Sequence, residues 1–176
     1  MIAQTAHFPG VSPETLYNAY LSSREHSAMT AGSRPASFFR PGEGAVAHGK
    51  EGDELCAFDF TGPDGQTQFS LTAKVLQLVP EKLIVLTWKN IVWNLALDPG
   101  EVTDLDSTVV LTFQKNIAGA EIQLVQVNVP DYKVSVPETG EIGSLSSIVN
   151  THWSLLYWEP MRKYFQKRSE GDEVSA

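Results

Sequence analysis

Four histidines are the side chains of this sequence best suited to acid–base or metal chemistry. They are His7, His26, His48 and His152, and none falls in an HExxH, HxH or cysteine–histidine pattern. The spacing therefore predicts no metal site. His152 precedes Trp153 near the end of the chain, and we expect it to reach the interior as a core or rim histidine rather than as a catalytic base.

Carboxylates are the second group that could do chemistry. Asp104 and Asp106 lack the glycine and the distal glutamate of a calcium-binding loop, so we interpret them as part of a solvated connection between strands. Glu51, Asp53 and Glu54 are close neighbours in a polar stretch, where mutual repulsion and solvent exposure are the expected outcome. Neither group predicts a catalytic pair.

Nucleophile and phosphate motifs are absent from the sequence. It contains no GxSxG elbow and no phosphate-binding glycine loop after a buried strand. Cys56 is the single cysteine, lies between apolar neighbours in "ELCAFDF", and is interpreted as a small buried hydrophobe. We predict no enzyme active site and no cofactor.

Aromatic residues form the clearest pattern. On the strands expected below, the inward positions include Phe58, Phe60, Phe69, Trp88 and Phe113. Trp153, Tyr157 and Met161 follow one another at intervals of four residues, which places them on one stripe of a helix. If these residues line a ligand cavity, its predicted walls are Phe58, Phe60, Leu71, Trp88, Phe113, Trp153, Tyr157 and Met161. A tightly packed core is the alternative, and the sequence leaves both open.

The composition limits the partners and the cellular setting. The chain has 176 residues, of which 42% are apolar and 19% charged, and this is typical of one folded domain. Its net charge of −8 repels nucleic acid and anionic lipid, so neither is a predicted partner. No signal peptide and no run of about 18 apolar residues is present. With one cysteine, these features favour a cytoplasmic protein.

Two short helices are predicted after a first strand at 2–8. Ser12 followed by Pro13 is a helix start with proline at the first helical position. Ser22 and Glu25 have the spacing of a capping box, which predicts a second helix directly after the first. The expected buried stripe consists of Leu16, Tyr17 and Tyr20.

Alternation of apolar and polar residues predicts antiparallel strands in the middle of the chain. They cover 54–61, 67–79, 80–90, 106–115 and 120–129, and the first strand and a short one at 36–39 bring the total to six or seven. In the strand at 54–61 we assign Cys56 to the inward side with the two phenylalanines. In the strand at 120–129 the apolar residues change parity, which predicts a β-bulge near Leu124. The segments 40–54 and 130–147 are predicted to be long loops.

The last element predicted is a long helix. Ser144 or Ser146 can cap it, it runs to about Arg168, and Pro160 inside it should produce a kink. It alone is long enough to cover the apolar face of the sheet. The sequence thus predicts an α+β fold in which a curved antiparallel sheet wraps around the C-terminal helix.

The order and spacing of four motifs resemble a known family. They are "FPGVSPETLYNAY", "LVPEKLIVLTWKN", "STVVLTFQK" and "HWSLLYWEPMRKYF", which together span about residues 5–167. They resemble the activator of heat-shock protein 90 ATPase homologue-like branch of the SRPBCC, or START-like helix-grip, superfamily. The resemblance implies a helix-grip fold, one domain over 1–168 followed by a flexible acidic tail at 169–176, and a cavity that many superfamily members use for apolar ligands.

Two functions follow from this resemblance together with the aromatic pattern. The first is a non-enzymatic binding module that holds a small apolar or amphipathic molecule between sheet and helix. The alternative is a protein-interaction domain that binds a chaperone or another protein partner. The resemblance also implies a third alternative, a cyclase- or dehydratase-like cavity enzyme, because some START-like proteins catalyse such reactions. The sequence predicts no oligomeric state.

Overall fold

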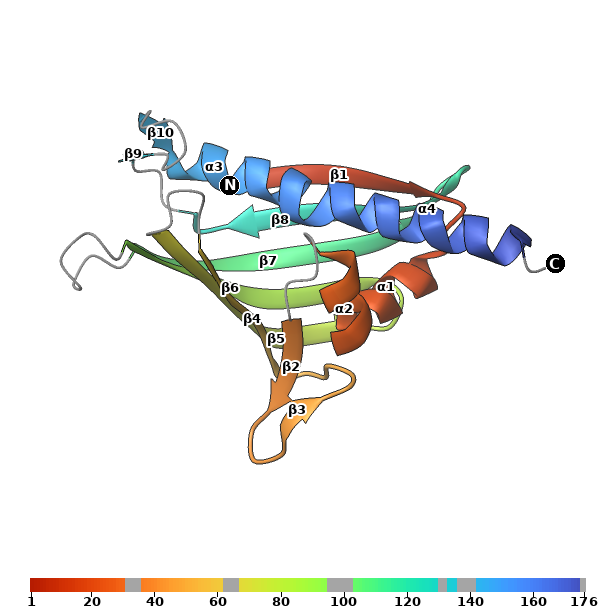
Figure 1. The fold of residues 1–176 in the computed structure, drawn as a ribbon, viewed down its shortest axis with the longest axis horizontal. Helices are drawn as coiled ribbons and strands as arrows, with labels where there is room; N and C mark the ends of the chain where they lie inside the picture. Colours follow the sequence, from red (N-terminus) through yellow and green to blue (C-terminus); the bar gives the residue numbers. More distant parts are fainter. Residues whose placement is uncertain (31–35, 62–66, 95–102, 130–132, 136–141, 175–176) are drawn as a thin grey trace.

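An eight-stranded antiparallel sheet curves around a long C-terminal helix (Figure 1). The computed structural model describes residues 1–30, 36–61, 67–94, 103–129, 133–135 and 142–174. The strand order is β1-β8-β7-β6-β5-β4-β2-β3. The strands are β1 (Ile2–Pro9), β2 (Ala36–Arg40), β3 (Gly44–Val46), β4 (Glu54–Thr61), β5 (Thr67–Val79), β6 (Leu83–Asn94), β7 (Thr103–Lys115) and β8 (Gly119–Val127). This is the helix-grip architecture that the sequence predicted.

The strand count is higher than the six or seven predicted. The additional strand of the main sheet is β3, only three residues long, which is too short for alternation to show in the sequence. A separate two-stranded sheet, β9 (Lys133–Ser135) and β10 (Ile142–Ser144), lies in the segment predicted to be a loop. The segment at 103–106, interpreted as a connection, belongs to β7, where Asp106 is exposed.

The two N-terminal helices begin where the sequence predicted. In α1 (Pro13–Leu21) the Ser12 side chain accepts a hydrogen bond from the Thr15 backbone N–H, and Pro13 is the first helical residue. In α2 (Ser23–Met29) the Ser22 side chain accepts from the Glu25 N–H. The predicted stripe of α1 is buried, and Tyr20 has no exposed surface.

Two predictions of side-chain direction in the sheet were wrong. Among the side chains of β4 that the structure describes, Leu55 is buried and Cys56 is half-buried. The register is regular from Glu54 to Ala57, and the irregularity in pairing with β5 falls later, between Ala57 and Phe60. In β8 no bulge occurs near Leu124, since the pairing with β7 is regular throughout. Regular alternation then turns Gln126 inward, where it is fully buried.

The C-terminal helix contains a π-helical segment. It comprises α3 (Leu145–His152), η1 (Trp153–Trp158) and α4 (Glu159–Val174). Pro160 has no N–H to offer the Leu156 carbonyl. In the turn before it the hydrogen bonding spans five residues, as between the Glu159 N–H and the Ser154 carbonyl. Near Pro160, where the sequence predicted a kink, the regular α-helical hydrogen bonding is thus replaced by a π-helical turn.

The C-terminal helix begins where the sequence predicted but ends later than predicted. Ser144 is the N-cap and accepts from the Ser147 N–H, as predicted. The helix continues to Val174, beyond Arg168, where the sequence placed its end. No helix in the described part of the chain is long and apolar enough to cross a bilayer.

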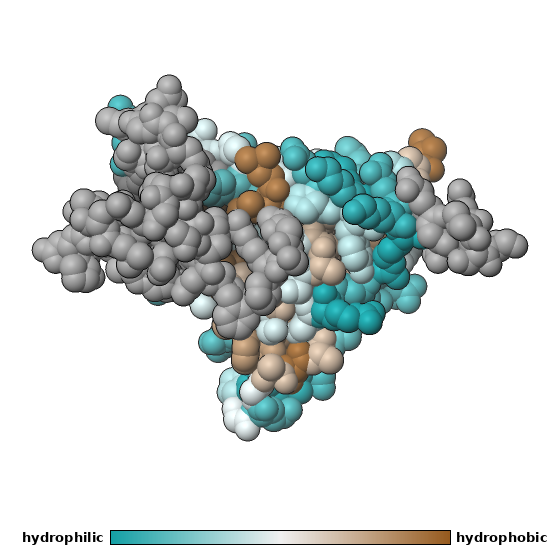
Figure 2. Space-filling view, viewed as in Figure 1, coloured by the Kyte–Doolittle hydropathy of each residue, from teal (hydrophilic) through white to brown (hydrophobic). Residues whose placement is uncertain are grey.

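The helix is also tied to the edge strand of the sheet. Trp158 donates its indole N–H to the side-chain carbonyl of Gln4, whose amide donates to the backbone carbonyl of Asn150 at 2.7 Å. Arg162 donates to the backbone carbonyl of His7, so a side chain of α4 reaches the β1 backbone. Figure 2 shows hydrophilic residues along the outer side of α4 and α1, and a hydrophobic patch over β2 and β3.

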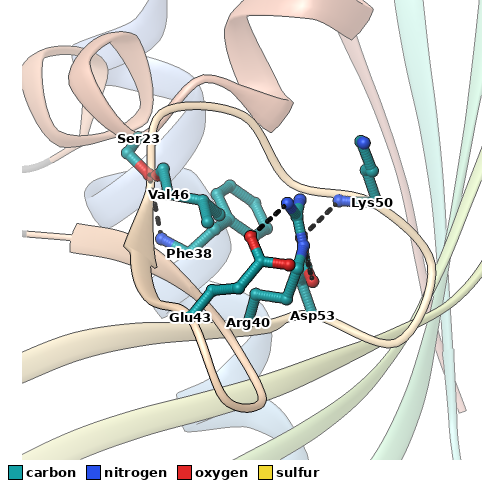
Figure 3. A network of polar contacts seen from close by, with 7 residues as sticks. All are labelled: Ser23, Phe38, Arg40, Glu43, Val46, Lys50 and Asp53. Atoms are coloured by element: carbon teal, nitrogen blue, oxygen red, sulfur yellow. Dashed lines mark hydrogen bonds and ion pairs between the residues drawn. The ribbon is translucent and has the colours of Figure 1, made fainter.

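At the opposite end of the sheet, ionic contacts anchor the β2–β3 hairpin (Figure 3). Arg40 donates from Nε and Nη2 to the two carboxylate oxygens of Asp53 at 3.0 and 2.9 Å, and the Lys50 backbone N–H donates to the same carboxylate at 2.8 Å. Only 2% of the Asp53 side chain is exposed. The sequence had interpreted Asp53 as a solvated loop residue, and that was wrong because Arg40 neutralises it. Glu51 also has a defined role, since its carboxylate accepts from the Leu78 N–H.

Candidate functional site

Three of the predicted cavity residues form one aromatic cluster between the sheet and the helix. The ring centroid of Trp153 lies 4.6 Å from that of Trp88 on β6 and 4.7 Å from that of Tyr157. Trp158 stacks on the other side of Trp153 at 5.4 Å. Because η1 is π-helical, all three of its aromatic rings are buried on the side that faces the sheet. We call Trp88, Trp153, Tyr157 and Trp158 the aromatic cluster.

The remaining predicted cavity residues do not join this cluster in the described structure. Met161 is fully buried one turn farther along the helix. Phe113 lies toward the other end of the sheet, where its ring meets Tyr17 of α1 at 5.5 Å. Leu71 is half-buried against the core. The side chains of Phe58 and Phe60 lie outside the described residues, although their backbone belongs to β4.

A chain of hydrogen bonds connects the aromatic cluster to the sheet. Trp153 donates its indole N–H to the Gln126 side-chain carbonyl at 2.7 Å, and the Gln126 amide donates to the Ser107 hydroxyl at 2.8 Å. Ser107 in turn donates to the backbone carbonyl of Trp88 at 3.0 Å. Gln126 and Ser107 are both buried. The chain fixes the two tryptophans relative to each other and satisfies every polar atom that it links.

A second polar group lies on the helical side of the cluster. His26 of α2 is buried, with Nδ1 at 2.7 Å from the Tyr20 carbonyl and Nε2 at 3.3 Å from the Tyr157 hydroxyl. A carbonyl can only accept, so Nδ1 carries the proton and Nε2 accepts from Tyr157. Burial lowers the pKa of His26 to about 4, although the bond to the Tyr20 carbonyl acts in the opposite direction. His26 is therefore neutral at physiological pH.

Tyr20 completes this second group, which we call the Tyr20–His26–Tyr157 group. Its ring lies 4.6 Å from that of His26 and nearly parallel to that of Tyr157, at 6.4 Å. Its hydroxyl is buried and has no hydrogen-bond partner among the described residues. Burial, and secondly the Tyr157 hydroxyl, raise the pKa of Tyr20 well above its usual range.

The sequence did not identify the polar residues of the site. It assigned the interior histidine to His152, which is half-buried, and the structure places His26 there instead. One signal was available, since the apolar Met29 follows His26 by three positions, on the same side of α2. Regular alternation along β8 and β7 would have placed Gln126 and Ser107 on the inner side, but neither residue was assigned to a side from the sequence.

The titratable side chains in and near this site are uncharged or already paired within the protein. His26 is neutral, and both of its nitrogens take part in hydrogen bonds within the protein. Burial raises the pKa of the Cys56 thiol, which lowers its thiolate content. In the part of the chain that the structure describes, no cluster of three or more His, Cys, Asp or Glu side chains could hold a metal ion. Aromatic surface and neutral polar groups are what the site offers a ligand.

A pocket of about 720 Å³ opens at the end of the sheet, away from the aromatic cluster. Its walls come from the turn between β1 and α1, the turn between β5 and β6 and the turn between β7 and β8. Of the predicted cavity residues only Phe113 contributes to it. Gly119 is required here because an added Cβ would lie 2.6 Å from the Phe8 carbonyl oxygen.

Solved structures of similar fold cover nearly the whole chain. A protein of Mesorhizobium loti has a TM-score of 0.61 at 17% identity, over 95% of this chain and 96% of that one. A protein of Rhizobium leguminosarum has a TM-score of 0.59 at 12% identity, over 94% and 93%. The AHSA1 protein of Silicibacter pomeroyi has a TM-score of 0.58 at 12% identity, over 97% and 98%. At these identities the likeness establishes the fold.

The family comparison goes further than the fold. A search of curated proteins found no match. The family model described as "Activator of Hsp90 ATPase homolog 1-like protein" matches residues 10–165, which include both N-terminal helices, strands β2 to β8 of the main sheet and the C-terminal helix as far as Phe165. The chain therefore belongs to the family of activator of Hsp90 ATPase homolog 1-like proteins.

Proposed function

We propose that this protein is a non-enzymatic binding module that holds a small apolar or amphipathic molecule between the sheet and the C-terminal helix. The observation that supports this most directly is the aromatic cluster, which joins large apolar rings to buried polar atoms in one place. Ligand sites commonly combine mostly apolar walls with a few positioned polar groups. The proposed walls are Trp88, Trp153, Tyr157 and Met161, with Phe58, Phe60 and Leu71 contributed by the same sheet.

Phe113 has a different place in this proposal. It lies at the end pocket and contacts Tyr17, so it would close the far end of the interior instead of lining its centre. The site that we propose is thus shorter than the one predicted from the sequence. The ligand would lie along η1 and the first turn of α4, against β6 and β7.

Native mass spectrometry of freshly purified protein tests the proposal directly, since a retained small molecule adds to the mass of the folded chain. A second test measures the affinity for phenylnaphthylamine, an uncharged apolar fluorescent probe. We expect Trp153→Ala to weaken probe binding about tenfold, a loss of about 1.4 kcal/mol. Leu155→Ala is the matched control, because Leu155 belongs to the same η1 segment but is 51% exposed.

Two outcomes of this test decide the proposal. If both variants bind the probe equally well, the aromatic cluster is not a ligand wall. If Trp153→Ala does not fold, Trp153→Phe keeps one aromatic ring in place. It removes the donor to Gln126 and part of the apolar wall, so it should still weaken binding relative to Leu155→Ala. Circular dichroism establishes which variants are folded.

Binding to a chaperone is the second candidate function, and family membership is the observation that favours it. If it holds, saturating amounts of this protein stimulate the ATPase of a heat-shock protein 90 homologue. Absence of stimulation at saturation would remove this candidate without affecting the first. The two functions are compatible, because one uses the interior and the other the surface.

A further inference from the structure

The Tyr20 hydroxyl is a buried polar group with no partner in the described protein. It has no exposed surface, and no described donor or acceptor lies within hydrogen-bond distance. A buried polar group left unpaired costs about 1–3 kcal/mol, and such groups are rare in folded proteins. Its neighbour Tyr157, by contrast, donates to His26. An uncompensated hydroxyl in this position indicates a place where a polar atom from outside the chain is received.

The hydroxyl belongs to the first ring in a continuous row of packed aromatic rings. The Tyr20 ring is 6.4 Å from Tyr157, which is 4.7 Å from Trp153, which is 4.6 Å from Trp88. A molecule whose polar atom reaches Tyr20 would therefore have its apolar part against the two tryptophans. The ligand that fits has a polar head and an apolar body, in that order along η1.

The surroundings of Tyr20 are electrically neutral. The pKa of His26 is about 4 and that of Tyr20 is raised, so neither carries a charge near pH 7. Burial is the first cause of both shifts, and the others are the Tyr20 carbonyl and the Tyr157 hydroxyl, so no cation contributes. The nearest described ion pair on these elements, Arg168 with Glu25, is at the surface, where half of the Arg168 side chain is exposed.

This neutrality selects the chemical class of the head group. A carboxylate or phosphate buried beside Tyr20 would lose its hydration without gaining a counter-charge, which costs several kcal/mol. A hydroxyl or a carbonyl would lose far less and would gain a hydrogen bond from Tyr20. An ammonium head is disfavoured for the same reason as an anion.

We propose that the Tyr20–His26–Tyr157 group receives the uncharged hydroxyl or carbonyl head of an amphipathic ligand whose apolar body packs against Trp153 and Trp88. This inference rests on the proposed function and specifies its ligand class. Because Tyr20 has no exposed surface, binding must separate η1 from α1 by about the width of the head group. Tyr20 and Tyr157 are thus specificity-determining residues.

Displacement of phenylnaphthylamine by two ligands of equal chain length, decanol and decanoate, tests this class. Decanol is more apolar than decanoate in water, so the decisive comparison is between variants. We expect Tyr20→Phe to raise the decanol concentration needed for half-displacement about fivefold, the affinity that one net hydrogen bond supplies. Displacement by decanoate should change much less than displacement by decanol, and each half-displacement concentration is corrected for the probe affinity measured with the same variant. Tyr17→Phe, on the same helix, is the matched control and should leave all three values unchanged.

Each other result overturns the inference in a recognisable way. If Tyr20→Phe leaves the decanol curve unchanged, Tyr20 does not receive the head group. If Tyr20→Phe weakens decanoate as much as decanol, the site takes charged heads and the class is wrong. If the probe does not bind the unmodified protein at all, the proposed function fails together with this inference, whereas binding without discrimination removes only the inference.

Discussion

Two buried polar groups of this protein are built in opposite ways. At the β2–β3 hairpin, Asp53 is charged, and its carboxylate accepts from Arg40 through both oxygens and from the Lys50 N–H (Figure 3). In the interior, His26 and Tyr157 are neutral and paired, but the Tyr20 hydroxyl has no partner among the described residues. The first group is complete within the chain, and the second is not.

The difference matches the structural role of the first group and the binding role that we propose for the second. A complete ionic group holds a hairpin at the edge of the sheet, and nothing further can be added to it without breaking a bond already made. An incomplete neutral group lowers the stability of the folded chain and gains when a ligand supplies the missing atom. Native proteins commonly place such unsatisfied groups at functional sites. The predictions below test this contrast through stability.

The largest expected change in the free energy of unfolding comes from lowering the pH, because His26 is buried in its neutral form. In the unfolded chain His26 binds a proton below its ordinary pKa of 6.5, whereas in the folded chain it does so only below about 4. Between these values the unfolded state holds more protons, so the free energy of unfolding falls as the pH is lowered from 6.5 to 4. The full loss is about 3 kcal/mol. Urea unfolding measured across this range checks it.

His26→Gln should remove this step from the stability profile, even if it lowers stability at neutral pH. His48→Gln removes an exposed histidine and should keep the step. Asp53 does not interfere, because the hydrogen bonds from Arg40 lower its pKa below 3.8, so its contribution is lost only under more acidic conditions. If the unfolding free energies of the unmodified protein and both variants fell in parallel with pH, His26 would not be buried in its neutral form.

Asp53→Ala should have the next largest effect. It removes the acceptor for Arg40 and for the Lys50 N–H, and we expect the free energy of unfolding to fall by about 2 kcal/mol. The value is below that of a fully buried pair because Arg40 remains in contact with water. Glu43→Ala is the control, since Glu43 contacts the same arginine from an exposed position. Equal losses in the two variants would contradict the structural role of Asp53.

Tyr157→Phe should cost about 1 kcal/mol, because it leaves the Nε2 atom of His26 buried without its donor. Thermal or urea unfolding at pH 7.5 measures the change. Tyr164→Phe is a useful comparison: its hydroxyl donates to Glu25, which also pairs with Arg168 and is partly open to water. We expect a smaller loss for Tyr164→Phe, and a larger one would show that the His26–Tyr157 bond contributes little.

Local signals in the sequence predicted the framework of the fold. Ser12, Ser22 and Ser144 cap helices as expected, and the long strands lie close to the segments predicted from alternating apolar and polar residues. Both signals depend only on residues that are neighbours in the chain. The short β3 and the β9–β10 pair escaped this reasoning, since three-residue strands depend on their partners for stability.

The polar residues of the site could not be predicted in the same way. Gln126 can be buried because it bonds to Ser107 and Trp153, which are 19 and 27 residues away in the sequence. His26 can be buried because it bonds to Tyr157, which is 131 residues away. Without these partners each would have been expected in water. The aromatic half of the site was accessible from the sequence, because Trp153 and Tyr157 are spaced for one side of a helix.

The smallest effect, and the only one of opposite sign, is expected for Tyr20→Phe. Removing a buried hydroxyl that has no described partner takes away a desolvation cost and keeps the ring contacts with His26 and Tyr157. We expect the unfolding free energy of the protein without added ligand to rise by up to about 1 kcal/mol, while Tyr17→Phe leaves it unchanged. Saturating decanol should cancel this difference, because fivefold tighter binding stabilises the unmodified protein by about 1 kcal/mol more than the variant. A loss of stability in Tyr20→Phe without decanol would mean that the hydroxyl is already satisfied, and the two polar groups would then not differ as the structure indicates.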